Sequence, residues 1–127
     1  MLNVSSLCAE LPISYFAVYN AAKVYVDRLT QACAIEYPEI DFMTLRPSEV
    51  STKMTAFKKD IFTIEPYQCV EPLLDDIAYQ TVSHGHSVHA LQSWIYNTVP
   101  FSFFTFLWEK VFVREFKEVR KNFEMKK

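Results

Sequence analysis

The chain has 127 residues, half of them hydrophobic, and its 13 basic and 15 acidic residues leave a net charge of -2. This is the length of one domain. The near-neutral charge argues against a nucleic-acid partner, because such proteins carry a strongly basic surface. Gly85 is the only glycine, where an average chain of this length would hold about nine. These residues therefore exclude a glycine-rich phosphate-binding loop, which needs several glycines for tight turns and close backbone approach.

The first part of the chain predicts strands and helices in alternation. Residues 1–6 have the character of the end of a strand, and a loop follows. From Ser14 to Tyr37 apolar residues recur at every third or fourth position, which predicts a long helix that Pro38 ends. Residues 40–46 alternate and are rich in strand formers, so they predict a second strand. This order is typical of an α/β protein with parallel strands.

A second helix is expected after a polar stretch. It would begin near Glu65 and continue to about Ala78, with a kink at Pro72. Residues 84–89 surround the single glycine and predict a turn that leads into a short extended segment. The segment also has three histidines in an HxHxxH pattern. Because no cysteine or carboxylate adjoins them, we expect a turn here and no metal site.

Aromatic residues gather in the last third of the chain. Residues 94–108 hold seven of them, and residues 110–127 are strongly basic. The aromatic stretch has Pro100 in its middle and is shorter than the roughly twenty residues that a bilayer span needs. Three interpretations stay open: a core helix, the wall of a pocket for an acyl chain or sterol, and a segment at a membrane interface.

Three side chains in the first part of the chain suggest redox chemistry on a carbonyl group. Tyr19 and Lys23 are one helical turn apart and share a face, and Ser6 lies at the end of the first strand. A lysine ammonium stabilises a neighbouring phenolate, which prepares a tyrosine for general acid or base catalysis. A serine hydroxyl can hydrogen-bond the reacting carbonyl oxygen. Tyrosine and lysine also occur four positions apart by chance, so the pair alone does not establish the chemistry.

Further motifs give this pair a context. These motifs are Asn3-Val4-Ser5-Ser6, Leu11-Pro12, Tyr19-Asn20-Ala21-Ala22-Lys23 and Arg46-Pro47-Ser48-Glu49-Val50-Ser51-Thr52. In order and spacing they resemble the second half of the short-chain dehydrogenase/reductase family, whose patterns are N-x-S-S, Y-x-x-x-K and P-G-x-V-x-T. The resemblance implies an α/β fold in which residues 1–91 form the C-terminal portion of a doubly wound, Rossmann-like parallel sheet. Residues 92–127 would be an aromatic and then basic helical extension.

The resemblance also implies roles for single residues. Tyr19 would be the general acid or base, and Lys23 would bind the nicotinamide ribose and support Tyr19. Ser6 would orient the substrate carbonyl, and it is preferred over Ser5 because it has the family's spacing to the tyrosine. The nicotinamide would be bordered by Pro47, Val50 and Thr52.

Two departures from the family pattern matter. Ser48 stands where the family usually has a glycine. The family's glycine-rich cofactor loop, its N-A-G strand and its active-site asparagine all precede the region that the chain resembles. The resemblance therefore implies that these residues are the C-terminal part of a longer enzyme.

The later residues resemble one branch of the family more loosely. Lys53-Met54, the helix near Pro66, residues 85–91, Trp94-Ile95 and the basic tail are similar to the 17β-hydroxysteroid dehydrogenase and very-long-chain 3-oxoacyl-CoA reductase branch. That branch implies NADPH, with NADH still open, and a lipid ketone substrate, either a 3-oxoacyl-CoA or a 17-oxosteroid. It also implies the cytosolic face of the endoplasmic reticulum membrane, with surface contact through Trp94 to Trp108 and a homodimer through the helix from Ser14 to Tyr37.

A non-enzymatic function is the alternative. Without the cofactor-binding half, the chain would be a remnant that acts as a membrane-associated binding or interaction module. Cys8, Cys33 and Cys69 are an odd number without a CxxC pair, so we expect reduced thiols. The N-terminal residues lack the pattern of a secretory signal.

Overall fold

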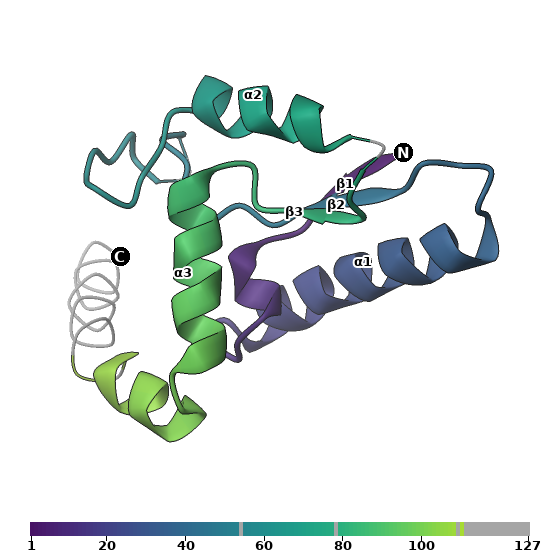
Figure 1. Cartoon of the computed structure of the whole chain (residues 1–127). Coiled ribbons are helices and arrows are strands. Elements are labelled where there is room, and N and C mark those ends of the chain that lie inside the picture. Colours follow the sequence, from purple (N-terminus) through teal and green to yellow (C-terminus); the bar gives the residue numbers. More distant parts are fainter. Residues whose placement is uncertain (54, 78, 109, 111–127) are drawn as a thin grey trace, which may run out of the picture.

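The computed structural model describes residues 1–53, 55–77, 79–108 and 110, and the predicted alternation of strands and helices is present in it (Figure 1). Residues 101–108 are also helical. The basic residues 111–127, which we expected to be helical, lie outside the described part. In chain order the elements are β1 (Leu2–Val4), a short 3₁₀ helix η1 (Leu7–Ala9), α1 (Ala17–Glu36), β2 (Met43–Leu45), α2 (Pro66–Asp76), β3 (Val82–Ser83) and α3 (Ser87–Thr98).

The strands form one parallel sheet in the order β1-β2-β3. Leu2 is paired with Met43, and Thr44 with Val82. Helix α1 connects the first two strands and α2 connects the next two, and Figure 1 shows these helices on opposite sides of the sheet. This arrangement confirms the α/β class with parallel strands and is consistent with a Rossmann-like fold.

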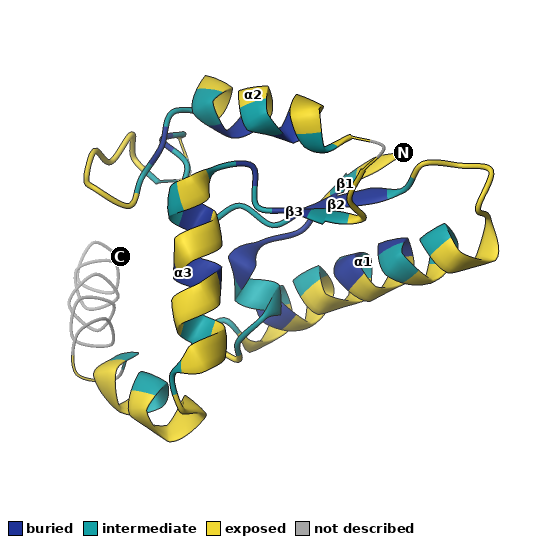
Figure 2. Ribbon diagram, in the orientation of Figure 1, coloured by how far each residue is buried: buried dark blue, intermediate teal, exposed yellow. Residues whose placement is uncertain are grey.

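The two sides of the sheet differ in polarity. The side that faces α2 holds the apolar core, and Figure 2 shows buried residues on the inner side of that helix. On the other side the contacts with α1 are polar: Asn3 donates a hydrogen bond to the Thr30 hydroxyl at 2.8 Å. Polar contacts therefore fix how α1 lies on the sheet. The core cluster consists of Met43, Leu45, Ile64, Cys69 and Leu73, with Val50 packed against it.

The turn expected around Gly85 is present as a bend, but the short extended segment expected after it was wrong. The strand β3 ends at Ser83, before the bend, and helix α3 begins after it at Ser87. The His86 ring accepts a hydrogen bond from the Val88 amide at 3.2 Å and so caps the helix start. A strand of two residues is too short to show alternation, and a histidine cap is not among the usual helix-start signals.

Gly85 is required where it stands. Its φ is +72°, and a Cβ at this position would lie 2.6 Å from Cys69 Sγ and 2.7 Å from the Cys69 carbonyl oxygen. Among the other described residues, three have positive φ without being glycine: Tyr15 at 71°, Ala56 at 52° and Phe57 at 54°. The left-handed region is unfavourable for such residues.

Candidate active site

The segments that carry the predicted site residues meet at the carboxyl edge of the sheet. The Leu7 amide, just after β1, donates to the Pro47 carbonyl at 2.9 Å, and the Arg46 amide donates to the Ser83 carbonyl at 2.7 Å. These bonds join the chain segments that leave all three strands. In open α/β sheets this edge is where ligands bind.

Tyr19 and Lys23 lie together on α1. Lys23 Nζ is 5.6 Å from the centre of the Tyr19 ring, which is within cation–π distance. The same Nζ donates a hydrogen bond to the Val4 carbonyl at 3.0 Å, so the pair lies beside the end of β1. Phe16 packs edge-on against the half-buried Tyr19 ring at 6.2 Å. The ammonium retains donors for a further ligand, because lysine has three.

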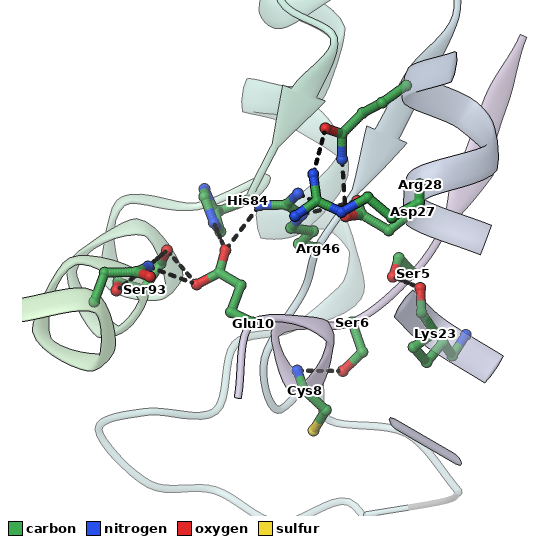
Figure 3. A network of polar contacts seen from close by, with 12 residues as sticks. Ser5, Ser6, Cys8, Glu10, Lys23, Asp27, Arg28, Arg46, His84 and Ser93 are labelled. Carbon is green, nitrogen blue, oxygen red and sulfur yellow. Dashed lines mark hydrogen bonds and ion pairs between the residues drawn. The ribbon is translucent and has the colours of Figure 1, made fainter. Parts of the chain in front are cut away.

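The two serines after β1 have different partners (Figure 3). Ser5 Oγ donates to the Lys23 carbonyl at 2.8 Å and thereby fixes this turn of α1 to the end of β1. Ser6 Oγ accepts from the Cys8 amide at 3.2 Å and caps η1. In the described part of the chain no hydrogen bond joins Ser6 to Tyr19 or Lys23. The carbonyl-orienting role of Ser6 stays a prediction.

The segment from Pro47 to Thr52 runs from this edge toward α2. Val50 forms a parallel bridge with Ile64. The Thr52 amide donates to Thr55 Oγ1 at 2.9 Å. No hydrogen bond between residues of the described ranges connects Val50 or Thr52 with the Tyr19–Lys23 pair. Only Pro47, through Leu7, is directly tied to the segment that carries the serines.

A buried ionic cluster, which the sequence did not reveal, lies at the same edge (Figure 3). Arg46 donates to both carboxylate oxygens of Asp27, at 2.9 and 2.7 Å, and to Glu10 at 3.0 Å. Glu10 also contacts His84 at 3.0 Å and accepts from the Ser93 hydroxyl at 2.6 Å. Glu10 and Arg46 are 36 positions apart in the chain, so no local motif marks the contact.

The contacts within the cluster favour the charged forms of Glu10 and Arg46. Burial raises the pKa of Glu10, but hydrogen bonds with His84 and Ser93 and the electrostatic interactions with His84 and Arg46 outweigh burial and lower the pKa to about 2. Burial likewise lowers the pKa of Arg46, and its contacts with Asp27 and Glu10 reverse the effect and raise the pKa. Both groups are therefore charged throughout the physiological range.

Comparison with known proteins gives this edge a context. The chain is 32% identical over 125 residues to the 17-beta-hydroxysteroid dehydrogenase type 3 of Danio rerio, a match that covers 96% of the chain and 40% of the relative. It is 29% identical to the very-long-chain 3-oxoacyl-CoA reductase of Anas platyrhynchos, with 80% of the chain and 34% of the relative covered. The corresponding enzyme of Homo sapiens is 27% identical, over 79% of the chain and 33% of the relative.

The chain is homologous to this branch of the short-chain dehydrogenase/reductase family.

The matched region is the C-terminal part of the relatives. The chain spans 40% of the first relative and 33% to 34% of the two reductases. No family model and no solved structure matches the chain. The relatives are oxidoreductases by name, and they confirm the resemblance to this branch of the family.

The residues of this short-chain reductase homologue fit one end of a dinucleotide cofactor. Lys23 and Pro47 lie at the carboxyl edge, where the family resemblance places the nicotinamide ribose. The phosphate end would need a cradle of free amides beside glycines. Gly85 offers none, because Cys69 and Leu45 fill the space beside its Cα and its amide donates to Ser83 Oγ at 3.0 Å. The fit is therefore to the nicotinamide end.

The three histidines have separate structural roles. His84 contacts Glu10, and His86 caps α3. His89 is completely buried, and burial lowers the pKa of its ring. Among the residues that the structure describes, no group of three or more metal-ligating side chains is placed to hold a metal ion.

The aromatic segment shows features of all three interpretations. Tyr96 and Phe104 pack edge to face at 5.0 Å, and Phe104 stacks on Trp108 at 5.9 Å. Phe101 and Thr105 line a cavity of about 550 Å³ whose other walls are residues 8–14 and the first half of α1. Trp94, Phe103, Phe106 and Leu107 are exposed. No helix in the described ranges is long and apolar enough to cross a bilayer.

Proposed function

We propose that the chain provides the proton-transfer side of an NADPH-dependent reductase of a lipid ketone, either a 3-oxoacyl-CoA or a 17-oxosteroid. One observation carries this proposal: Tyr19 and Lys23 lie together at the carboxyl edge of a parallel sheet. The names of the relatives support the substrate class. The choice of NADPH over NADH rests on the family resemblance.

The chain's own residues would handle the carbonyl oxygen. The nicotinamide, when bound, supplies a hydride to the carbonyl carbon. Tyr19 donates its phenolic proton to the oxygen as negative charge develops there. Lys23 stabilises the resulting phenolate and donates to the nicotinamide ribose. Ser6 donates a hydrogen bond that holds the carbonyl oxygen, and the segment with Pro47, Val50 and Thr52 borders the nicotinamide.

Replacing Tyr19 tests the mechanism. Tyr19→Phe removes the proton donor and leaves the ring, so we expect turnover to fall by roughly a hundredfold or more. The assay follows NADPH oxidation with 3-oxoacyl-CoA and 17-oxosteroid substrates. It uses both the chain itself and a chimera in which the unmatched N-terminal part of the Danio rerio relative precedes it.

Tyr25→Phe is the matched control, because Tyr25 lies on the same helix and is exposed. It should retain full turnover. Near wild-type turnover of Tyr19→Phe would contradict the mechanism.

A second candidate is a binding module without catalysis. The absence of a glycine-lined phosphate cradle in the described residues favours it, since the space beside Gly85 is filled. In that case the chain alone would not bind NADPH. Saturable quenching of its tryptophan fluorescence by NADPH would contradict this candidate and support the reductase.

We further propose that the segment from Trp94 to Trp108 contacts a membrane surface, which would suit an enzyme at the endoplasmic reticulum. Phe103 and Phe106 are each about half exposed, at 53% and 52%, and Lys110 lies over the Phe106 ring at 4.5 Å. Exposed aromatic rings beside basic residues favour the interface of anionic lipids.

Vesicle sedimentation tests the membrane contact. Vesicles of phosphatidylcholine and phosphatidylserine should bind the chain, and the double variant Phe103→Ser with Phe106→Ser should weaken binding about tenfold. Leu74→Ser in α2 is the control for losing an exposed apolar side chain elsewhere. Equal binding by all three proteins would contradict the contact.

A further inference from the structure

All the proposed site residues lie on three chain segments. Ser6 is on the segment that leaves β1, Tyr19 and Lys23 are on α1, and Pro47 begins the segment that leaves β2. For the proposed chemistry these segments must hold their side chains in one geometry, because misplacement by about an ångström can reduce turnover a hundredfold. Apart from those of Arg46, the hydrogen bonds that directly join these segments in the described part of the chain are few: Ser5 to Lys23, Lys23 to Val4, Asn20 to Leu11, and Leu7 to Pro47.

One guanidinium group joins all three segments. Arg46 directly precedes Pro47. Its Nε and Nη2 hold the two carboxylate oxygens of Asp27, which lies one helical turn after Lys23 on α1. Its Nη1 holds Glu10, four positions after Ser6. No other side chain of the described residues bonds to both the serine segment and α1 from the end of β2.

The cluster is rigid as well as central. The Asp27 and Glu10 side chains are only 4% and 7% exposed, and that of Arg46 is 16% exposed. Gln31 donates to Asp27 at 2.8 Å, and Ser93 and Asn97 of α3 donate to Glu10. Each carboxylate is therefore held by Arg46 and by at least one further donor. These contacts restrict the positions of both carboxylates relative to Arg46.

We infer that Arg46 is a positioning residue for the proposed reductase site, which sets the relative placement of the serine segment, of the Tyr19–Lys23 turn and of the Pro47 segment. The inference rests on the proposed function. Arginine suits the task because its planar fork bonds two carboxylates in fixed directions, whereas a lysine ammonium is a point charge that imposes no such geometry.

The experiment places a fluorine probe on the residue that Arg46 is inferred to position. 3-Fluorotyrosine is introduced at position 19, and its ¹⁹F resonance is recorded in the whole chain with wild-type residues, with Arg46→Gln and with Arg46→Lys. Lys59→Gln is the matched control, because it removes an exposed positive charge and Lys59 lies outside the cluster around Arg46. Near-UV circular dichroism shows which variants are folded.

We expect one sharp resonance in the wild type and in Lys59→Gln. Arg46→Lys keeps the positive charge and should fold, but it should shift or split the resonance because it cannot hold both carboxylates in place. Arg46→Gln should show the larger change, and added guanidinium ion should restore part of the wild-type signal. A folded Arg46 variant with an unchanged resonance would overturn the inference.

Turnover separates this inference from the proposed function. In the chimera described above, Arg46→Lys should lower kcat about a hundredfold, whereas Lys59→Gln should retain the kcat of the wild-type chimera. A wild-type chimera without turnover would count against the proposed reductase alone, because the fluorine signal reports placement without catalysis. Full turnover by Arg46→Lys would overturn the positioning role.

Discussion

Glu10 is a negative charge that the fold buries. Its side chain is 7% exposed, and four other side chains bond to its carboxylate, those of Arg46, His84, Ser93 and Asn97. A buried carboxylate is tolerated only when its partners compensate for lost hydration. Removing its charge therefore leaves Arg46 incompletely paired, and the stability of the chain should depend on the ionisation of this one group.

The pH dependence follows from the pKa of Glu10. It falls from an ordinary value of 4.5 to about 2, so folding favours the ionised form. The corresponding stabilisation, up to about 3 kcal/mol, is complete above pH 4.5 and is lost as the pH falls toward 2. We expect Glu10→Gln to lower the free energy of unfolding at pH 7 and to match the wild type near pH 2, as measured by urea unfolding.

Glu36→Gln provides the control for that series, because Glu36 is exposed at the end of α1. It should unfold like the wild type at every pH. If Glu10→Gln has a free energy of unfolding that is lower than the wild type by the same amount from pH 7 to pH 2, the ionised Glu10 carboxylate does not stabilise the fold.

Gly85 is the other residue on which the structure depends. Gly85→Ala would add a methyl group 2.6 Å from Cys69 Sγ and 2.7 Å from the Cys69 carbonyl, at a φ of +72°. We expect the free energy of unfolding to fall by about 3 kcal/mol. Cys69→Ala added to Gly85→Ala removes the contact with the sulfur only. The loss of stability that comes from the Cys69 carbonyl contact and from the positive φ should therefore stay. Unfolding of Gly85→Ala at the wild-type urea concentration would contradict this account.

At the scale of elements, α2 combines strong start signals with an internal proline. Pro66 is in its first turn, and Glu65 and Gln68 form a reciprocal capping box. The helix continues through Pro72 to Asp76 even though proline removes a backbone donor and crowds the preceding turn. The cap and the packing of Cys69 and Leu73 in the core offset this penalty.

Pro72→Ala should therefore stabilise the chain. An alanine restores the backbone donor toward the Gln68 carbonyl, and we expect a gain of about 1 to 2 kcal/mol in the free energy of unfolding. Pro38→Ala is the control, because Pro38 lies beyond the end of α1 and is exposed. A lower unfolding midpoint for Pro72→Ala would show that the proline shape is needed for packing.

At the scale of the whole molecule, the features predicted from sequence are those that depend on neighbours along the chain. Helix α1 and strand β2 follow from periodicity, and one helical turn suffices to place Tyr19 beside Lys23. Strand β3 was not predicted, because two residues give no pattern. The Glu10–His84 contact joins residues 74 positions apart and depends on the sheet having brought their segments together.

Helix α1 exposes an apolar surface on the side that faces away from the sheet. Its outer face carries exposed Val18, Tyr25, Leu29 and Ile35, and Figure 2 shows this side of the helix as exposed. Exposed apolar patches are typical of surfaces that bind another protein, a membrane or a ligand. The expected homodimer through the helix from Ser14 to Tyr37 stays a prediction. Strand β1 is paired on one side only among the described residues, so its other edge is open to a further strand.

The positive φ values of Tyr15, Ala56 and Phe57 have a consequence for how this protein can change. Each conformation is one that glycine would adopt without strain, and each retains about 1 kcal/mol of unfavourable backbone energy. Tyr15 precedes the helix of Tyr19, and Ala56 and Phe57 follow Thr52, so the strain lies in two loops outside the helices and strands. A single change to glycine at any of these positions would relieve this backbone strain without removing a side chain of the apolar core.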